Sequence, residues 1–246
     1  CVGKVCKSLN SGDFKIVKYN DKENVEIQFT NTGYETVARF GNIKSGNVKD
    51  KYLPSVYGVG VIGTKYPTRV NGALTKEYTL WVSVLQRCYS DIYQKKQPTY
   101  IDCEVSDNFK SYEYFYEWCN NQVGFSNQGW QLDKDLLVKG NKVYSEDSCV
   151  FLPQEINKVL TKSDKTRGKH PIGVSWHKRD KAFMAKVSKS KGKPEWLGYF
   201  NTELEAYNAY KIAKEAFIKE QANKFKSQID PRAYEALMNY EVGIDD

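Results

Sequence analysis

The chain has 246 residues, of which 14% are aromatic and 27% are charged, and its formal net charge is +7. This length can bury one large core or two to three small ones, and this composition excludes a disordered chain. No apolar run approaches the length that crosses a bilayer, and residues 1–10 lack the apolar core of a signal peptide. We therefore expect a cytoplasmic protein without a membrane partner.

Six cysteines are scattered along the chain, and neither histidine lies close to one of them in the sequence. Structural zinc sites use closely spaced Cys and His ligands, so we expect no structural zinc. Four of the cysteines stand among apolar or aromatic residues, where a thiol behaves as a small hydrophobe. We expect reduced core residues at Cys88, Cys103, Cys119 and Cys149.

The first part of the chain has a short β pattern. Val25, Ile27 and Phe29 alternate with polar residues, and a turn at 31–33 precedes a second predicted strand at 35–40. This pattern predicts a small antiparallel barrel or meander, to which the sequence assigns no chemistry.

Helical spacing of apolar residues begins near residue 75. Residues 80–88 predict one amphipathic helix and residues 108–119 a second, and such stripes usually face a core. A short predicted strand at 149–152 follows, and Pro153 opens another helix.

Positive charge is concentrated between Lys158 and Lys193. This segment contains twelve Lys or Arg residues and two acids, Asp164 and Asp180, a local balance of +10. Because the basic segment overlaps a strand pattern, it indicates a surface that binds phosphates.

The last predicted domain has three strands and a helix. Period-two alternation on its second strand places Phe183, Ala185 and Val187 toward the helix, and Met184, Lys186 and Ser188 outward. The helix begins at Thr202 with a capping-box pattern and can cover only one face of the sheet. The other face is then available to a ligand.

The patterns together predict an α+β chain of five segments. They are a small β-rich domain (1–70), a middle domain of strands and helices (71–161), a basic linker (162–169), the strand–helix domain (170–228), and a C-terminal helix with an acidic tail (229–246).

The strand–helix domain (170–228) resembles the APETALA/ethylene-response-factor DNA-binding domain, which occurs in plants and in phage homing endonucleases. The resemblance lies in Gly173-Val174, the 183–187 strand, Trp196-Leu197-Gly198-Tyr199-Phe200 and the alanine-rich helix. It implies a three-stranded antiparallel sheet that packs on one helix and enters the major groove of double-stranded DNA. The implied DNA contacts are Gly173, Ser175, His177, Arg179, Lys181, Lys186, Ser188 and Trp196.

This chain departs from that family at positions where the family has arginines. Ser175, His177 and Ser188 occupy them, so we expect fewer bidentate contacts to guanine and lower base specificity. The structural alternative is that Trp196 belongs to the core and the lysines only aid solubility.

The middle domain is similar to the ββα-metal (HNH) fold of phage homing endonucleases. The similarity lies in Leu132-Asp133-Lys134-Asp135, the Gly140-Asn141 turn, the 149–152 strand and the helix with Asn157. It implies that Asp133 and Asn157 hold Mg²⁺ or Mn²⁺, and it places Lys134 where the family has its histidine base. A protonated lysine cannot take a proton from water, so Lys134 would contact the phosphate instead. The alternative ligands or bases are Asp135, Asn141 and Glu155.

The sequence is compatible with three functions. The preferred one is a double-stranded-DNA-binding protein of the phage homing-endonuclease type, in which catalysis at Asp133, Lys134 and Asn157 is undecided. The second is a non-catalytic DNA-binding regulator on a degenerate HNH scaffold. The third is a phage protein-interaction module, acting against host defence through the N-terminal β domain. For the HNH residues themselves, the structural alternative is that Asp133, Lys134 and Asp135 form an exposed hairpin and Asn157 caps or decorates a helix.

Overall fold

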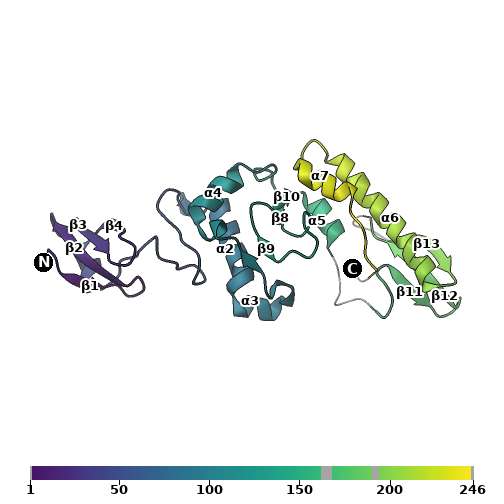
Figure 1. Cartoon of the computed structure of the whole chain (residues 1–246), viewed down its shortest axis with the longest axis horizontal. Helices are drawn as coiled ribbons and strands as arrows, with labels where there is room; N and C mark the ends of the chain where they lie inside the picture. The colour runs from purple at the N-terminus through teal and green to yellow at the C-terminus, as the bar shows by residue number, and fades with distance from the viewer. Residues whose placement is uncertain (1, 162–167, 190–193, 245–246) are drawn as a thin grey trace. The chain divides into compact units, whose positions relative to one another are not determined.

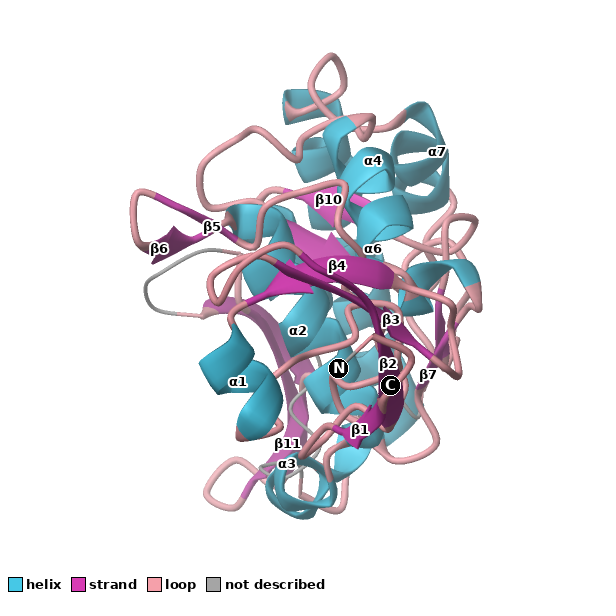
Figure 2. Ribbon diagram, turned by 90° about the vertical axis from the view of Figure 1, so that its left-hand side faces the viewer, coloured by secondary structure: helices cyan, strands magenta, loops and turns pink. Residues whose placement is uncertain are grey.

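The structure, a computed structural model, describes residues 2–161, 168–189 and 194–244 (Figure 1). It contains both helices and strands, as the α+β prediction requires (Figure 2). Two compact units are present: unit 1 comprises Cys1–Cys119 and Lys142–Glu146, and unit 2 comprises Asn120–Asn141 and Asp147–Asp246. Within the described ranges, no helix has the length and apolarity needed to span a membrane.

Unit 1 begins with an antiparallel meander in the order β1-β2-β3-β4. Its strands are β1 (Val5–Lys7), β2 (Asp13–Tyr19), β3 (Val25–Phe29) and β4 (Glu35–Ala38). The alternation on β3 turns Val25, Ile27 and Phe29 into the core of this sheet, as predicted. Ile43, from the short helix α1 (Phe40–Lys44), packs on the same core.

The remainder of unit 1 is mainly helical. Its elements are β5 (Arg69–Val70), β6 (Ala73–Leu74), α2 (Lys76–Tyr89), α3 (Asp91–Lys96), η1 (Pro98–Tyr100), β7 (Glu104–Val105), η2 (Asn108–Lys110), α4 (Tyr112–Asn120) and β9 (Val143–Tyr144), which pairs in parallel with β7. Helix α2 contains the first predicted helix. The second, at 108–119, is divided into η2 and α4, because Ser111 is extended and forms a β-bridge with Val61.

Unit 2 contains two antiparallel sheets and three helices among its described residues. They are β8 (Gln131–Asp133), β10 (Val150–Leu152), α5 (Gln154–Leu160), β11 (Val174–His177), β12 (Ala182–Val187), β13 (Glu195–Phe200), α6 (Glu203–Lys224) and α7 (Pro231–Met238). Strand β8 pairs with β10, and α5 follows, giving a ββα arrangement. The other sheet, β11-β12-β13, packs on α6, which confirms the predicted C-terminal sheet and helix.

Helix α6 belongs to two hydrophobic cores. Its first half places Ala206 and Tyr210 against Ala185 and Val187 of the three-stranded sheet. Its second half places Ile218 and Ala222 in a core with β10, α5 and α7. The predicted capping box is confirmed at the start of α6, where Thr202 and Glu205 bond reciprocally. One helix therefore links the ββα arrangement to the sheet, two parts that the sequence assigns to separate domains.

Candidate nucleic-acid interface and ββα site

One face of the three-stranded sheet is not covered by α6. The register pairs Ser175 with Met184 and Met184 with Tyr199, and it pairs Lys186 with Trp196. On the opposite face Ala185 and Val187 are fully buried. The predicted alternation on β12 is therefore confirmed, and these five cross-strand partners form the outer face of the sheet.

A bulge on β13 adds Tyr199 to the outer face. Lys186 pairs with Trp196 and Ala185 with Gly198, so Leu197 is the extra residue, and it packs on the core side. Gly198 has φ +138°, a value that L side chains rarely adopt. Strict alternation would have put Tyr199 on the wrong face; the glycine inside the strand was the available signal for a bulge.

Aromatic side chains cover much of this outer face. Trp196 is 57% exposed and Tyr199 is 43% exposed, with ring centroids 5.6 Å apart. The His177 ring lies 5.2 Å from that of Tyr199. The exposure of Trp196 excludes the alternative in which it is a core residue. Exposed aromatic clusters of this kind mark binding surfaces in proteins.

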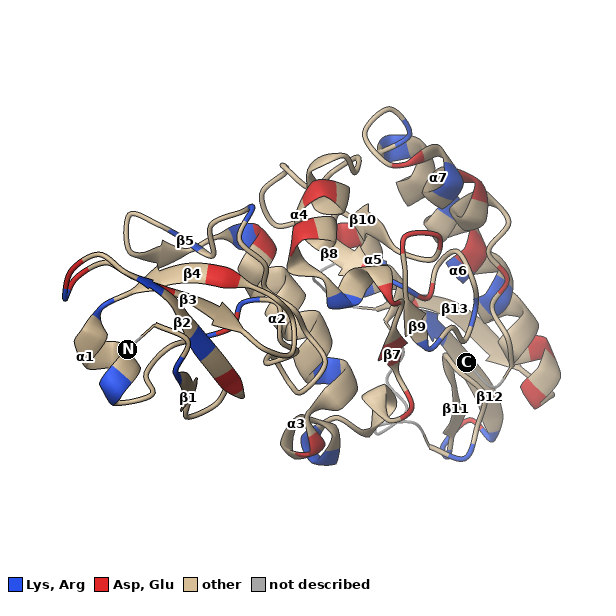
Figure 3. Cartoon of the chain, turned by 60° about the vertical axis from the view of Figure 1, so that its left-hand side comes forward, with Lys and Arg blue, Asp and Glu red and all other residues tan. Residues whose placement is uncertain are grey.

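The turn between β11 and β12 is charged at its tip (Figure 3). The Arg179 side chain is 84% exposed and pairs with Asp180 at 2.9 Å, and this hydrogen bond lowers the pKa of the Asp180 carboxyl. His177 Nδ1 is buried 3.0 Å from Asp180 Oδ2, although the pair lacks hydrogen-bond geometry. Asp180 thus pairs with Arg179 and lies beside His177, in the turn that follows β11.

Not every predicted contact residue lies on that face. Gly173 has φ +77°, and a Cβ there would stand 2.0 Å from the ring of Tyr210, so this glycine permits close packing of sheet and helix. Ser188 and Lys181 are exposed beside the strands. Of the twelve basic residues in the 158–193 segment, five lie outside the described residues: Lys162, Lys165, Arg167, Lys191 and Lys193.

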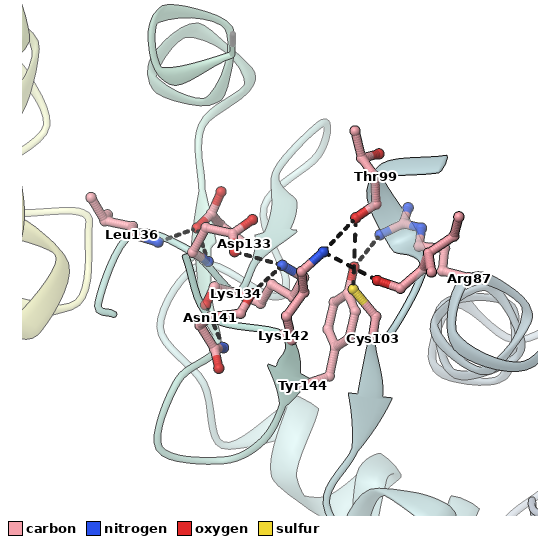
Figure 4. Close-up of polar contacts among 11 residues, drawn as sticks. Arg87, Thr99, Cys103, Asp133, Lys134, Leu136, Asn141, Lys142 and Tyr144 are labelled. Atoms are coloured by element: carbon pink, nitrogen blue, oxygen red, sulfur yellow. Dashed lines mark hydrogen bonds and ion pairs between the residues drawn. The ribbon is translucent and has the colours of Figure 1, made fainter. Parts of the chain in front are cut away.

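In the ββα arrangement, Asp133 ends β8 and organises the loop that follows. Its Oδ1 accepts hydrogen bonds from the backbone N–H groups of Asp135 (2.9 Å) and Leu136 (2.8 Å) (Figure 4). Burial raises the pKa of the Asp133 carboxyl, and the two backbone hydrogen bonds only partly oppose this effect. No hydrogen-bond partner from the described chain is found for its Oδ2.

Lys134 is buried, with 7% of the residue exposed. Its Nζ donates to Asp135 Oδ1 at 2.5 Å and to the carbonyl of Asn141 at 2.7 Å, and the Asn141 amide donates back to the Lys134 carbonyl at 2.8 Å. These bonds hold the 134–141 loop together, so the segment is not an exposed hairpin. They also direct the Lys134 ammonium group to partners within the chain, which favours a structural role.

Asn157 faces the same strand from α5. Its Nδ2 donates to Gln131 Oε1 at 2.8 Å, and Gln131 and Asp133 are two residues apart on β8, on one face. The amide oxygen of Asn157 and Oδ2 of Asp133 are hard oxygen donors of the type Mg²⁺ prefers. Glu155, a predicted alternative ligand, pairs with Lys224 at 2.7 Å. Within the described residues, no group of three or more His, Cys, Asp or Glu is placed to hold a metal.

The five described cysteines are all thiols, and Cys88, Cys103, Cys119 and Cys149 are buried as predicted. We compared the chain with models of known protein families, with curated proteins and with solved structures. None of these comparisons finds a match. The resemblances described above therefore depend on the residues of this chain alone.

The raised pKa of Asp133 predicts a pH-dependent stability. The folded state binds this proton more tightly than the unfolded state, whose carboxyl has a pKa of about 4. The stabilising contribution is therefore complete below that pH and is lost as the pH rises through the raised pKa. Asp133→Asn keeps the oxygen acceptor but removes the charge, so it should raise the free energy of unfolding at pH 7 and leave it unchanged near pH 4.

Urea unfolding of the variant and the parent chain between pH 4 and pH 8 measures this difference. The exposed Asp147→Asn change is the matched control and should leave the pH profile as it is. Equal effects of the two changes across the range would contradict the assigned burial penalty at Asp133.

Proposed function

We propose that this chain binds double-stranded DNA through the outer face of β11-β12-β13. The observation that supports the proposal most directly is the uncovered face itself, where Trp196 and Tyr199 are exposed beside Lys186. Lysines and arginines supply the phosphate contacts of DNA-binding proteins, while aromatic and polar side chains can contact base edges. A β-sheet of this size is one of the few β structures that enter the major groove.

The charges around this face favour a nucleic-acid partner. The turn between β11 and β12 contains Lys178, Arg179 and Lys181, opposed by Asp180 alone. Lys186 has no ion-pair partner among the described residues, so its charge is available to a phosphate. With Ser175 and His177 in place of arginines, affinity would come mainly from the phosphate backbone, and base specificity would be modest. Such a protein would act in the cytoplasm of a bacterial host during phage infection.

The binding proposal predicts a steep salt dependence. Fluorescence anisotropy with a labelled duplex should give an affinity that falls linearly with salt on logarithmic axes. Lys186→Ala should reduce this slope by about 0.9, the value for one lost phosphate contact. Trp196→Ala should weaken binding at least about tenfold with an unchanged slope, because it removes an uncharged interface anchor.

Lys219→Ala is the matched control, since Lys219 is an exposed lysine of α6. It should change neither affinity nor slope. If the parent chain binds no duplex at low salt, the proposal is wrong and the protein-interaction alternative gains support. An equal loss of duplex affinity in Lys186→Ala and Lys219→Ala would show that DNA does not bind preferentially at the outer face of the sheet.

A second candidate function is metal-dependent hydrolysis of the DNA backbone. It is favoured by the ββα arrangement, in which Asp133 ends β8 and Asn157 of α5 hydrogen-bonds to Gln131 on the same strand. A divalent ion held there would stabilise charge on the scissile phosphate and the leaving oxygen. Lys134 would hold the loop in place, and solvent would have to accept the proton from the attacking water.

Supercoiled plasmid distinguishes this candidate from a non-catalytic binder. If the chain is a nuclease, nicking should occur with Mg²⁺ or Mn²⁺, stop with EDTA, and fall at least about a hundredfold in Asp133→Asn. The duplex affinity of this variant in EDTA should match that of the parent chain. A salt-sensitive shift without nicking under any metal condition would leave a DNA-binding protein on a non-catalytic ββα scaffold.

A further inference from the structure

Unit 1 contains a guanidinium group without a carboxylate partner. Arg87, in the last turn of α2, is half-buried, and its Nη1 donates to the Tyr144 hydroxyl at 3.4 Å. The guanidinium carbon lies 5.5 Å from the centre of the Tyr100 ring. No carboxylate oxygen of the described chain lies within 4.0 Å of it.

The neighbours of Arg87 do not neutralise it. Burial keeps the pKa of the Tyr144 phenol far above its usual range, so this residue supplies no negative charge. Tyr100 contributes the face of its ring, which attracts a cation but leaves the net charge in place. A positive charge among neutral groups is unfavourable unless a counter-ion or solvent satisfies it.

Arg87 is also not needed to cap α2. The Gln94 amide lies within hydrogen-bond distance of the carbonyls of Arg87 (3.2 Å) and Cys88 (2.7 Å), and it also contacts the carbonyl of Tyr100 (3.2 Å). The backbone N–H of Ser90 donates a hydrogen bond to the carbonyl of Gln86. These groups satisfy the carbonyl end of the helix, so the guanidinium donors are left for another acceptor.

A second cation approaches the same segment of chain. Lys142 is exposed, and its Nζ donates to the carbonyls of Thr99 (3.2 Å) and Ile101 (3.1 Å), which flank the Tyr100 ring under Arg87. In Figure 4, Lys142 is directed toward Thr99, and Arg87 is directed toward the Tyr144 hydroxyl. The two side chains come from segments far apart in the sequence, α2 and the residue before β9, and are brought together by the parallel β7–β9 pair.

We propose that Arg87 and Lys142 form a phosphate-binding site in unit 1. The planar guanidinium, fixed by Tyr100 and Tyr144, presents its remaining N–H donors in the fork geometry that matches two phosphate oxygens. Lys142, whose Nζ is bonded to the carbonyls of Thr99 and Ile101, adds a second positive charge beside it. The ligand is a phosphate group, either of a nucleic-acid backbone or of a small molecule. This site does not depend on the DNA-binding face of unit 2.

Inorganic phosphate is the first probe. In the 246-residue chain, titration with sodium phosphate should shift the Arg87 Nε–Hε resonance saturably, and sodium chloride at matched ionic strength should not. Lys142→Gln should weaken the apparent affinity about two- to fivefold, as expected for loss of an exposed charge contact. Lys18→Gln, on an exposed face of β2, should have no effect. A linear shift, or one equal in chloride, would overturn the proposal.

Duplex DNA is the second probe, and it identifies the source of the phosphate. If the nucleic-acid backbone occupies the site, Lys142→Gln and Arg87→Lys should each change duplex affinity, and Lys142→Gln should reduce the salt slope by about 0.9. If a small molecule occupies it, the phosphate titration should stay saturable while duplex affinity is unchanged. A parent chain that binds phosphate at Arg87 but no duplex would refute the DNA-binding proposal and leave this one standing.

Discussion

The burial of α6 on both its halves is the constraint on which unit 2 depends. With 22 residues and a rise of about 1.5 Å per residue, the helix extends over roughly 33 Å. Its first half covers the inner face of the three-stranded sheet, and its second half completes the core of the ββα arrangement. Neither small sheet could bury enough apolar surface alone.

The end of the chain reinforces this arrangement. The carbonyl of Val242 accepts a hydrogen bond from the Tyr207 hydroxyl at 2.7 Å, and its backbone N–H donates to Glu215 at 2.9 Å. Tyr240 packs against both cores. The segment after α7 therefore lies along α6 and joins its two halves. A DNA-contacting sheet and a ββα arrangement built on one helix would approach a duplex as a single body.

The two faces of the three-stranded sheet have different surroundings. On the core face, Ala185 and Gly173 leave room for Tyr207 and Tyr210 of α6, and larger side chains such as Phe183 pack around them. Trp196 and Tyr199 lie on the outer face, where solvent alone does not favour large aromatic side chains. The ligand that would favour them is the proposed DNA.

Local patterns in the sequence were sufficient for much of the fold. The alternation on β3 and β12 and the capping box at Thr202 depend on neighbouring residues, and the structure contains all three. Features that depend on distant residues were not predictable in this way. The bridge between Val61 and Ser111 interrupts a predicted helix.

The candidate sites, too, were predictable only where they depend on residues close together in the sequence. The outer face of the sheet followed from period-two alternation except at the Leu197 bulge, which moved Tyr199. The burial of Lys134 could not be predicted, because lysine is seldom buried without partners, and besides the neighbouring Asp135 it donates to the carbonyl of Asn141, seven residues away. The tyrosine surroundings of Arg87 also require the β7–β9 pairing, which the sequence does not indicate.

Photochemical crosslinking to a duplex with bromodeoxyuridine in place of thymidine reports which side chains touch the bases. If the outer face of β11-β12-β13 binds DNA, crosslinks should form at Trp196 and Tyr199 and disappear as salt rises. Crosslinks confined to unit 1, or their absence under conditions where the duplex is bound, would contradict this proposal.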